Sequence, residues 1–334
     1  MRRRRSRLTP EAYAAGILGG DLVMLSRAIT LVESSLPSDR AIAGTLISQL
    51  MPHTGNSFRL GITGVPGVGK STFIDSFGSH LTQKGLKVAV LAIDPTSQVS
   101  RGSILGDKTR MKHLSMNPQA FIRPSPAGDS LGGVTRKTRE ALLLCEAAGF
   151  DYVIVETVGV GQSETAVHGM IDFFLLLALP NAGDELQGIK KGIMEMADGM
   201  LINKSDGEMI PAARKAKVQF GQALRLFPLP ESGWRPQVQL VSAINRDGLS
   251  ETQEMIEQYR EICKENGYWD QRRKSQSIQW MEDSIEDLLL RSFYGNSDIQ
   301  SKMEAMKKAV LAQSQSPIQA AEKLVDDWLN LRKD

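Results

Sequence analysis

The chain is poor in the residues that cross-link small secreted proteins or bind transition metals. Its 334 residues include two cysteines and four histidines. Cys145 and Cys263 cannot form a disulfide framework, and neither they nor the histidines stand at spacings typical of a metal site. A disulfide-stapled domain is therefore excluded, a role in metal delivery is disfavoured, and a reducing compartment fits the chain best.

An excess of charge and a long apolar segment are also lacking. Lys+Arg 40 and Asp+Glu 38 leave a formal net charge of +2, so no basic footprint for nucleic acid or an anionic membrane is expected over the surface. The longest apolar run, residues 173–179, is far shorter than the roughly 20 residues that span a bilayer. We therefore expect neither a nucleic-acid nor a membrane partner, and any bound anion must be recognised at a local site.

The chain begins with a basic run at residues 2–5, and no apolar segment of the kind found in secretory signals follows it. A short solvated tail is favoured over a trimmed organelle-targeting remnant. Together with the scarcity of cysteine, this favours the cytoplasm of a bacterium over the mitochondrial matrix.

The central part of the chain predicts an α/β fold. Short β-rich runs alternate there with helical segments, which is typical of βαβ units and a mostly parallel sheet. The runs are nearly all apolar, as expected when helices cover both faces of a sheet. They lie at residues 58–63, 88–93, 152–155, 173–179, 200–202 and 238–241.

Helical extensions are predicted on both sides of this core. Residues 9 to 50 indicate two helices, and residues 249–334 carry apolar residues at three- and four-residue steps. The C-terminal helices either pack on the core or protrude as an oligomerisation arm, because periodicity alone does not name their partner surface. We predict an N-terminal helical extension at 1–50, a nucleotide-binding domain at 51–248 and a C-terminal helical part at 249–334.

The strongest motif is a phosphate-binding loop. Residues 64–71 read GVPGVGKS and match G-x-x-x-x-G-K-[ST] in full, between a predicted strand and a predicted helix. Its backbone N–H groups would cradle phosphates, Lys70 would bridge the β- and γ-phosphates, and Ser71 would ligate Mg²⁺. The predicted phosphate-binding residues are Gly64, Val65, Pro66, Gly67, Val68, Gly69, Lys70, Ser71 and Thr72.

Two further loops select the base. Asn203, Lys204 and Asp206 have the N-K-x-D form of GTPases, in which the carboxylate accepts hydrogen bonds from the N1–H and the amine of guanine. After the next strand, Ser242, Ala243 and Ile244 would present backbone N–H groups to the guanine O6. Either match alone could be a capped turn. Because both follow consecutive strand ends, where ligands of α/β sheets bind, they jointly predict a GTP/GDP site.

The metal site is less standard. Glu156 stands where most GTPases carry the Asp of D-x-x-G, and Asp94 and Asp107 are further candidates for holding Mg²⁺. Asp94 could instead cap a strand-end turn, and Asp107 could be a solvated loop acid. Val160 occupies the position of the glutamine that orients the attacking water in Ras-like enzymes. Hydrolysis should therefore be slow unless Gln162, another residue or a partner supplies that function.

A glycine- and charge-rich segment follows the fourth predicted strand. Residues 180–192 are long for a connection between a strand and a helix, and they suit a loop that rearranges with nucleotide state. The alternative is a passive loop.

Taken together, these stretches resemble the MeaB-type GTPases, the methylmalonyl-CoA mutase-associated chaperones of the SIMIBI class. The resemblance runs from about residue 8 to the C-terminus and is strongest between 57 and 245. Ser100-Arg101-Gly102-Ser103 departs from the usual S-G-G-S of the family and puts an arginine in the first switch. The matching stretches are residues 61–67 (GITGVPG), 92–97 (AIDPTS), 103–111 (SILGDKTRM), 121–125 (FIRPS), 156–164 (ETVGVGQSE) and 180–192.

The resemblance implies a homodimeric GTPase that binds an adenosylcobalamin-dependent acyl-CoA mutase, above all methylmalonyl-CoA mutase. It implies gated delivery of adenosylcobalamin from an adenosyltransferase, and protection or reactivation of the mutase. It also implies a third switch at 180–192 and a C-terminal dimer arm. The implied Mg²⁺ ligands are Ser71, Asp94, Asp107 and Glu156. The implied catalytic residues are Lys70, Glu156, Gln162 and Lys190, the last coupling the third switch to the nucleotide.

Three other functions fit parts of the pattern. A metallochaperone GTPase of the same class would need a His-rich tail or a Cys/His cluster, which the chain lacks. A P-loop small-molecule kinase rarely needs the guanine-selecting N-K-x-D motif, although relatives have been labelled arginine/ornithine transport kinases. A nucleotide-gated binding module with negligible turnover is the third.

Overall fold

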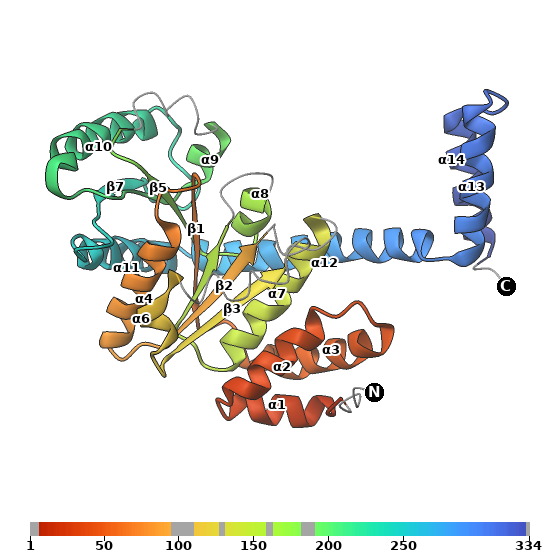
Figure 1. Ribbon diagram of the computed structural model, residues 1–334, viewed down its shortest axis with the longest axis horizontal. Coiled ribbons are helices and arrows are strands. Elements are labelled where there is room, and N and C mark those ends of the chain that lie inside the picture. The colour runs from red at the N-terminus through yellow and green to blue at the C-terminus, as the bar shows by residue number, and fades with distance from the viewer. Residues whose placement is uncertain (1–6, 95–109, 127–130, 158–162, 182–190, 332–334) are drawn as a thin grey trace. The chain divides into compact units, whose positions relative to one another are not determined.

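Seven strands form one parallel sheet in the order β3-β2-β4-β1-β5-β6-β7 (Figure 1). The computed structural model describes residues 7–94, 110–126, 131–157, 163–181 and 191–331. The predicted α/β class with helical parts at both ends is confirmed. The strands are β1 (Phe58–Gly64), β2 (Val88–Asp94), β3 (Ala120–Pro126), β4 (Tyr152–Glu156), β5 (Phe173–Ala178), β6 (Gly199–Ile202) and β7 (Gln237–Leu240).

Side-chain alternation along the strands divides the core into layers on the two faces of the sheet. Val88 and Val90 of β2 join one buried cluster, while Ala89 and Leu91 join another. Since successive side chains of a strand point to opposite faces, an unbroken apolar run supplies both layers at once.

The N-terminal segment forms three helices rather than the two that the sequence predicted. These are α1 (Pro10–Leu18), α2 (Leu22–Val32) and α3 (Pro37–Leu50). Pro37 starts α3, as expected of a proline, whose fixed φ suits the first helical turn. The Thr9 and Asp21 side chains cap α1 and α2, and Leu18 at the end of α1 is 45% exposed.

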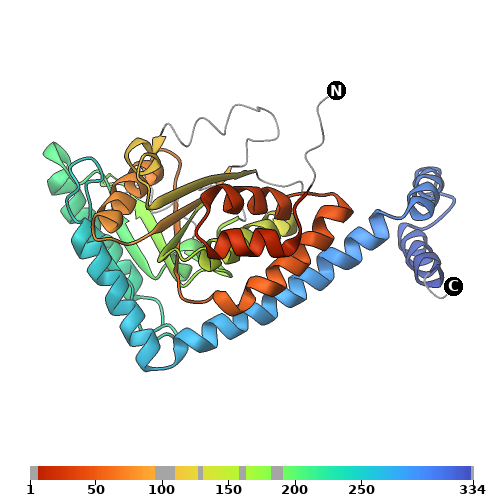
Figure 2. The same cartoon turned by 90° about the horizontal axis from the view of Figure 1, so that it is seen from below.

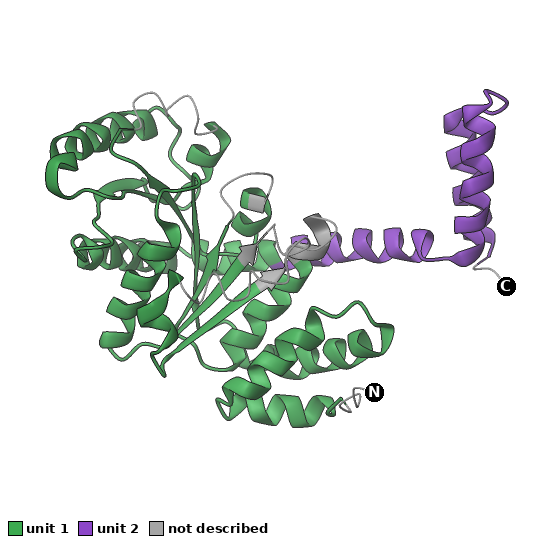
Figure 3. Cartoon of the chain, viewed as in Figure 1, with its two compact units in different colours: residues 1–276 green, residues 277–334 purple. Residues whose placement is uncertain are grey.

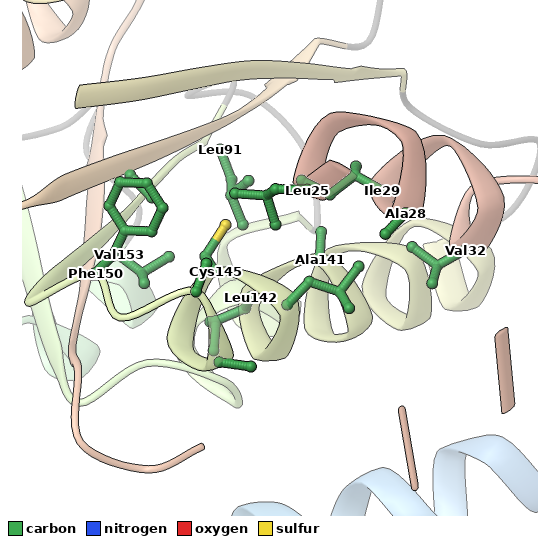
Figure 4. Packing of buried hydrophobic residues seen from close by; sticks show 14 of the residues in the cluster. Leu25, Ala28, Ile29, Val32, Leu91, Ala141, Leu142, Cys145, Phe150 and Val153 are labelled. Atoms are coloured by element: carbon green, nitrogen blue, oxygen red, sulfur yellow. The ribbon is translucent and has the colours of Figure 1, made fainter. Parts of the chain in front are cut away.

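The N-terminal helices cover one face of the sheet together with α7 (Leu131–Ala147). Figure 4 shows Leu25 and Ile29 of α2 lying against Ala141 of α7, with Leu91 of β2 beside them. This packing buries the apolar face that the three- and four-residue spacing in α2 created.

The other face is covered by α4 (Lys70–Gln83), α6 (Lys112–Ser115) and α11 (Leu249–Glu265), whose buried residues share one cluster with β1, β4 and β5. Beyond β6 and β7, α10 (Ile210–Arg225) packs in a third cluster. Two short helices, α8 (Ser163–His168) and α9 (Lys191–Met196), follow β4 and β5 in the chain.

Strand β3 was missed by the sequence pattern. Its segment contains Arg123, Pro124 and Pro126, which interrupt the kind of apolar run that marked the other strands. β3 is an edge strand that pairs only with β2, and proline is tolerated there because the free side of an edge needs no N–H donor.

Helix α12 (Tyr268–Tyr294) begins against the amino-terminal edge of the sheet, after the turn that Figure 2 shows between α11 and α12. Arg273 Nη2 lies 2.7 Å from Asp172 Oδ2, and Arg272 Nη1 lies 3.7 Å from Asp198 Oδ2. The two aspartates directly precede β5 and β6. The paired arginines therefore fasten the start of α12 to the sheet at the edge opposite the strand ends that carry the nucleotide motifs.

The chain divides into two compact units, residues 1–276 and 277–334 (Figure 3). In the second unit, α13 (Ser297–Leu311) packs against α14 (Pro317–Asn330) through Ile299, Leu324 and Trp328. The division falls within α12, whereas the boundaries at 50 and 248 stay predictions. Across the described ranges, no helix combines the length and the apolar character needed to cross a bilayer.

Candidate functional site

The phosphate-binding loop joins β1 to α4 with a backbone that only glycine adopts readily. Gly64 has φ +149° and Gly69 has φ +95°. A Cβ on Gly64 would lie 2.5 Å from the Leu177 carbonyl oxygen, and one on Gly69 would lie 2.7 Å from Asn203 Nδ2. Both glycines are thus required by backbone conformation and by close approach. Pro66, Gly67 and Thr72 are exposed, which leaves the outer side of the loop open to a ligand.

The N-K-x-D residues hold this loop from the neighbouring strand end. Asn203 Nδ2 donates to the Val68 carbonyl at 2.8 Å, and Lys204 Nζ donates to the Gly67 carbonyl at 2.9 Å. Two motifs that lie far apart in the sequence therefore form one structure, in which the base-selecting segment supports the phosphate-binding loop.

The side chain of Lys70 is hydrogen-bonded to the phosphate-binding loop. Its Nζ donates to the Gly64 carbonyl at 2.8 Å and to the Val65 carbonyl at 3.4 Å. Burial lowers the pKa of Lys70, while the carboxylates of Glu156 and Glu164 raise it. An ammonium held beside backbone carbonyls and poorly hydrated is ready to exchange these contacts for phosphate oxygens.

Ser71 and Glu156 meet at the carboxyl ends of β1 and β4. Ser71 Oγ donates to Glu156 Oε1 at 3.0 Å, and Glu156 is buried. A hydroxyl and a carboxylate are hard oxygen donors of the kind that Mg²⁺ prefers, so this pair fits the predicted metal site. Within the described residues, no group of three or more His, Cys, Asp or Glu side chains forms a complete metal site.

Four predicted site residues cannot be placed. Asp94 ends β2, but its side chain lies outside the described part of the structure. Asp107, Gln162 and Lys190 lie outside the described residues, as does Arg101 of the predicted first switch.

The two base-selecting loops also lie together. Asp206 Oδ2 accepts from Ser242 Oγ at 2.5 Å, and Asn203 Oδ1 accepts from the Ala243 N–H at 3.3 Å. Ser242 is fully buried, whereas the next residue but one, Ile244, is 77% exposed. The Asp206 carboxylate is therefore held in one orientation by a side chain of the second loop.

Residues that the motifs did not indicate also contribute. Ser76 of α4 donates to the Ala243 carbonyl at 2.6 Å, and Thr157 Oγ1 donates to Thr63 Oγ1 at 2.8 Å. Glu164 lies in the first turn of α8 and is buried. The sequence carried no spacing signal for Ser76, and Glu164 stood only within a family-like stretch.

Comparisons with known proteins agree with this site. A family model described as methylmalonyl Co-A mutase-associated GTPase MeaB matches residues 25–298. A probable GTPase of Mycobacterium tuberculosis is 46% identical over 318 residues, 95% of either chain. The mitochondrial methylmalonic aciduria type A homolog of Mus musculus is 42% identical, covering 93% of this chain and 77% of the mouse protein. A solved structure of a LAO/AO transport system kinase has a TM-score of 0.74 at 36% identity, covering 96% and 99% of the two chains.

Proposed function

The chain belongs to the MeaB family of methylmalonyl-CoA mutase-associated GTPases, and we propose that it binds an adenosylcobalamin-dependent acyl-CoA mutase and gates the loading of that cofactor. The observation that carries the proposal is the family match over residues 25–298, supported by the hydrogen bond that joins the two loops predicted to select guanine. Methylmalonyl-CoA mutase is the proposed partner, and an adenosyltransferase the proposed source of the cofactor. The two buried cysteines form no disulfide bond, which suits the cytoplasm of a bacterium.

The described residues account for nucleotide binding in separate roles. Asp206 accepts hydrogen bonds from guanine, and Ser242 orients it. The loop amides bind the phosphates at the N-terminus of α4, and Lys70 leaves its carbonyl partners for the β- and γ-phosphate oxygens. Mg²⁺ held by Ser71 and Glu156 would neutralise developing phosphate charge when bound. In hydrolysis, water oxygen bonds to the γ-phosphorus, and GDP leaves with the electrons of the broken P–O bond.

Homodimerisation through the second unit is part of the proposal. On α12, Ile278, Met281, Ile285 and Leu288 are each between 48% and 64% exposed. Their separations of three, four and three residues place them on one stripe of the helix, in the a/d pattern of a coiled-coil seam. A second copy of the same stripe is the occupant that such a repeated apolar seam fits best.

Partner-stimulated hydrolysis tests the proposal. Phosphate release from GTP and from ATP would be measured with and without methylmalonyl-CoA mutase from the same organism. We expect slow turnover of GTP alone and a clear increase with the mutase. Fast turnover of ATP that ignores the mutase would favour the P-loop kinase instead, and a pull-down from the native host would identify any other partner.

A further inference from the structure

Among the residues that the structure describes, a buried carboxylate beside the phosphate-binding loop has no hydrogen-bond donor. Glu164, in the first turn of α8, is 2% exposed. Neither Oε1 nor Oε2 accepts a hydrogen bond from any group in the described part of the chain. Another buried carboxylate does accept hydrogen bonds. Glu146, 3% exposed, accepts from Arg59 at 2.7 and 3.0 Å and from the Gly55 N–H at 2.9 Å.

Such an arrangement is costly for folding alone. A carboxylate taken out of water without donors loses its hydration, and the attraction of a nearby cation offsets only part of that loss. A buried polar group without a partner calls for a physical explanation, and a catalytic role or a bound water or ion is one.

Glu164 lies at the phosphate end of the nucleotide site. Its helix follows β4 in the chain and packs against β1, the two strands whose ends carry Glu156 and the phosphate-binding loop. The Glu164 carboxylate, like that of Glu156, is close enough to raise the pKa of Lys70. Glu156 already accepts from Ser71, whereas Glu164 has both oxygens open.

The chemistry of GTP hydrolysis limits which groups can donate a hydrogen bond to the Glu164 carboxylate. Phosphate oxygens are acceptors and cannot donate to a carboxylate. Of the species that the reaction brings to this end of the site, water can donate to a carboxylate, either as the molecule that attacks the γ-phosphorus or as one bound to Mg²⁺. We propose that Glu164 binds and orients this water, which supports the slow hydrolysis that remains although Val160 replaces the glutamine of Ras-like enzymes.

The proposed role of Glu164 concerns GTP hydrolysis and not the mutase. An experiment can therefore contradict this role without contradicting the mutase partnership, and the reverse. The test compares Glu164→Gln, which keeps an acceptor oxygen but loses the charge, with Glu254→Gln on the exposed surface of α11. Single-turnover GTP hydrolysis, GDP affinity, the Mg²⁺ dependence of nucleotide binding, and the Tm of the nucleotide-free protein are measured for each.

We expect Glu164→Gln to slow single-turnover hydrolysis by at least about tenfold while the KM for GTP and the GDP affinity stay within about twofold. If the Mg²⁺ dependence of nucleotide binding is unchanged in Glu164→Gln, the water that Glu164 binds is the attacking one. If the variant requires more Mg²⁺, that water is one bound to the metal. The Tm of the nucleotide-free variant should equal or exceed that of the parent, because an uncompensated buried charge is removed.

Two results would overturn the proposal. One is a lower Tm with a proportionate loss of GDP affinity, which would make Glu164 a structural partner of Lys70. The other is hydrolysis and Mg²⁺ dependence equal to those of Glu254→Gln. Glu164→Ala serves as a second variant, since it removes both acceptor oxygens and should slow hydrolysis further with the same KM.

Discussion

Ser76 Oγ donates to the carbonyl of Ala243 at 2.6 Å, although the two residues are 167 positions apart. Ser76 lies on α4, directly behind the phosphate-binding loop, and Ala243 lies in the second base-selecting loop. A buried hydrogen bond to this carbonyl fixes the peptide plane that joins Ala243 to Ile244. The predicted base-selecting loop is thereby tied to the helix that follows the phosphate-binding loop.

Ser76→Ala should therefore weaken guanine-nucleotide binding. Loss of one buried hydrogen bond, with an unsatisfied carbonyl left behind, costs about 1–3 kcal/mol, part of which appears as about tenfold weaker GTP and GDP affinity. Ser79→Ala is the matched control, because Ser79 is an equally buried serine of α4 whose hydroxyl bonds the Asp75 carbonyl of its own helix. Equal nucleotide affinity of the two variants would show that Ser76 does not couple the base-selecting loop to α4.

Asp206→Asn should relax the preference for guanine. An amide can accept only one of the two hydrogen bonds that the carboxylate accepts from guanine, and it turns an unmatched donor toward the base. The ratio of GTP to ATP affinity, measured by competition, should fall by at least about tenfold. An unchanged ratio would place base selection elsewhere. Xanthine nucleotides should bind the variant better than the parent, since they offer an acceptor to the new donor.

Lys190→Ala should separate nucleotide binding from partner-stimulated turnover. Lys190 lies outside the described residues, and its role as a contact of the third switch comes from the family resemblance. We expect nucleotide affinity within about twofold of the parent, and loss of the increase in hydrolysis that the mutase causes. Full stimulation of the variant by the mutase would refute the role.

Charge on the apolar stripe of α12 should dissociate the dimer. Ile285→Lys places an ammonium in the proposed seam, where it would be desolvated without a partner. Light scattering coupled to gel filtration should show a monomer at concentrations where the parent is dimeric. Gln279→Lys makes the same addition on an exposed polar position of α12 and should stay dimeric. If both variants remain dimers, the seam lies on another surface.

His168 should make the protein less stable in mild acid. Burial, and to a lesser extent the charge of Arg272, lowers the pKa of His168 from 6.5 to about 4. Arg272 Nη2 lies 3.3 Å from Nε2, which suits the neutral ring as an acceptor. The unfolded chain therefore takes up the proton first, and the free energy of unfolding falls between pH 6.5 and about 4, by at most about 3 kcal/mol. His168→Gln should show a shallower decline of Tm over that range.

Local patterns were sufficient for much of the fold because the relevant forces act over a few residues. The apolar runs that became β1, β2, β4, β5, β6 and β7 carried their own signal, whereas β3 did not. Its prolines are compatible with a strand only at the edge of a sheet, and edge position is decided by the other strands. Pro37 starts α3 by a local rule, because its fixed φ suits a first helical turn, although the apolar spacing over residues 9–50 predicted two helices.

The residues in their linear order were enough to predict a guanine nucleotide and the motifs for it, since the glycines of residues 64–69 and the N-K-x-D carboxylate depend on local backbone shape and a single side chain. Which side chains hold those motifs together became visible in the folded chain. Strand ends that meet across a parallel sheet bring Ser76 to the Ala243 carbonyl and Ser242 to the Asp206 carboxylate. The same arrangement leaves the Glu164 carboxylate without a donor among the described residues. Contacts between residues so distant in the chain leave no periodic trace, because they depend on the order of the strands.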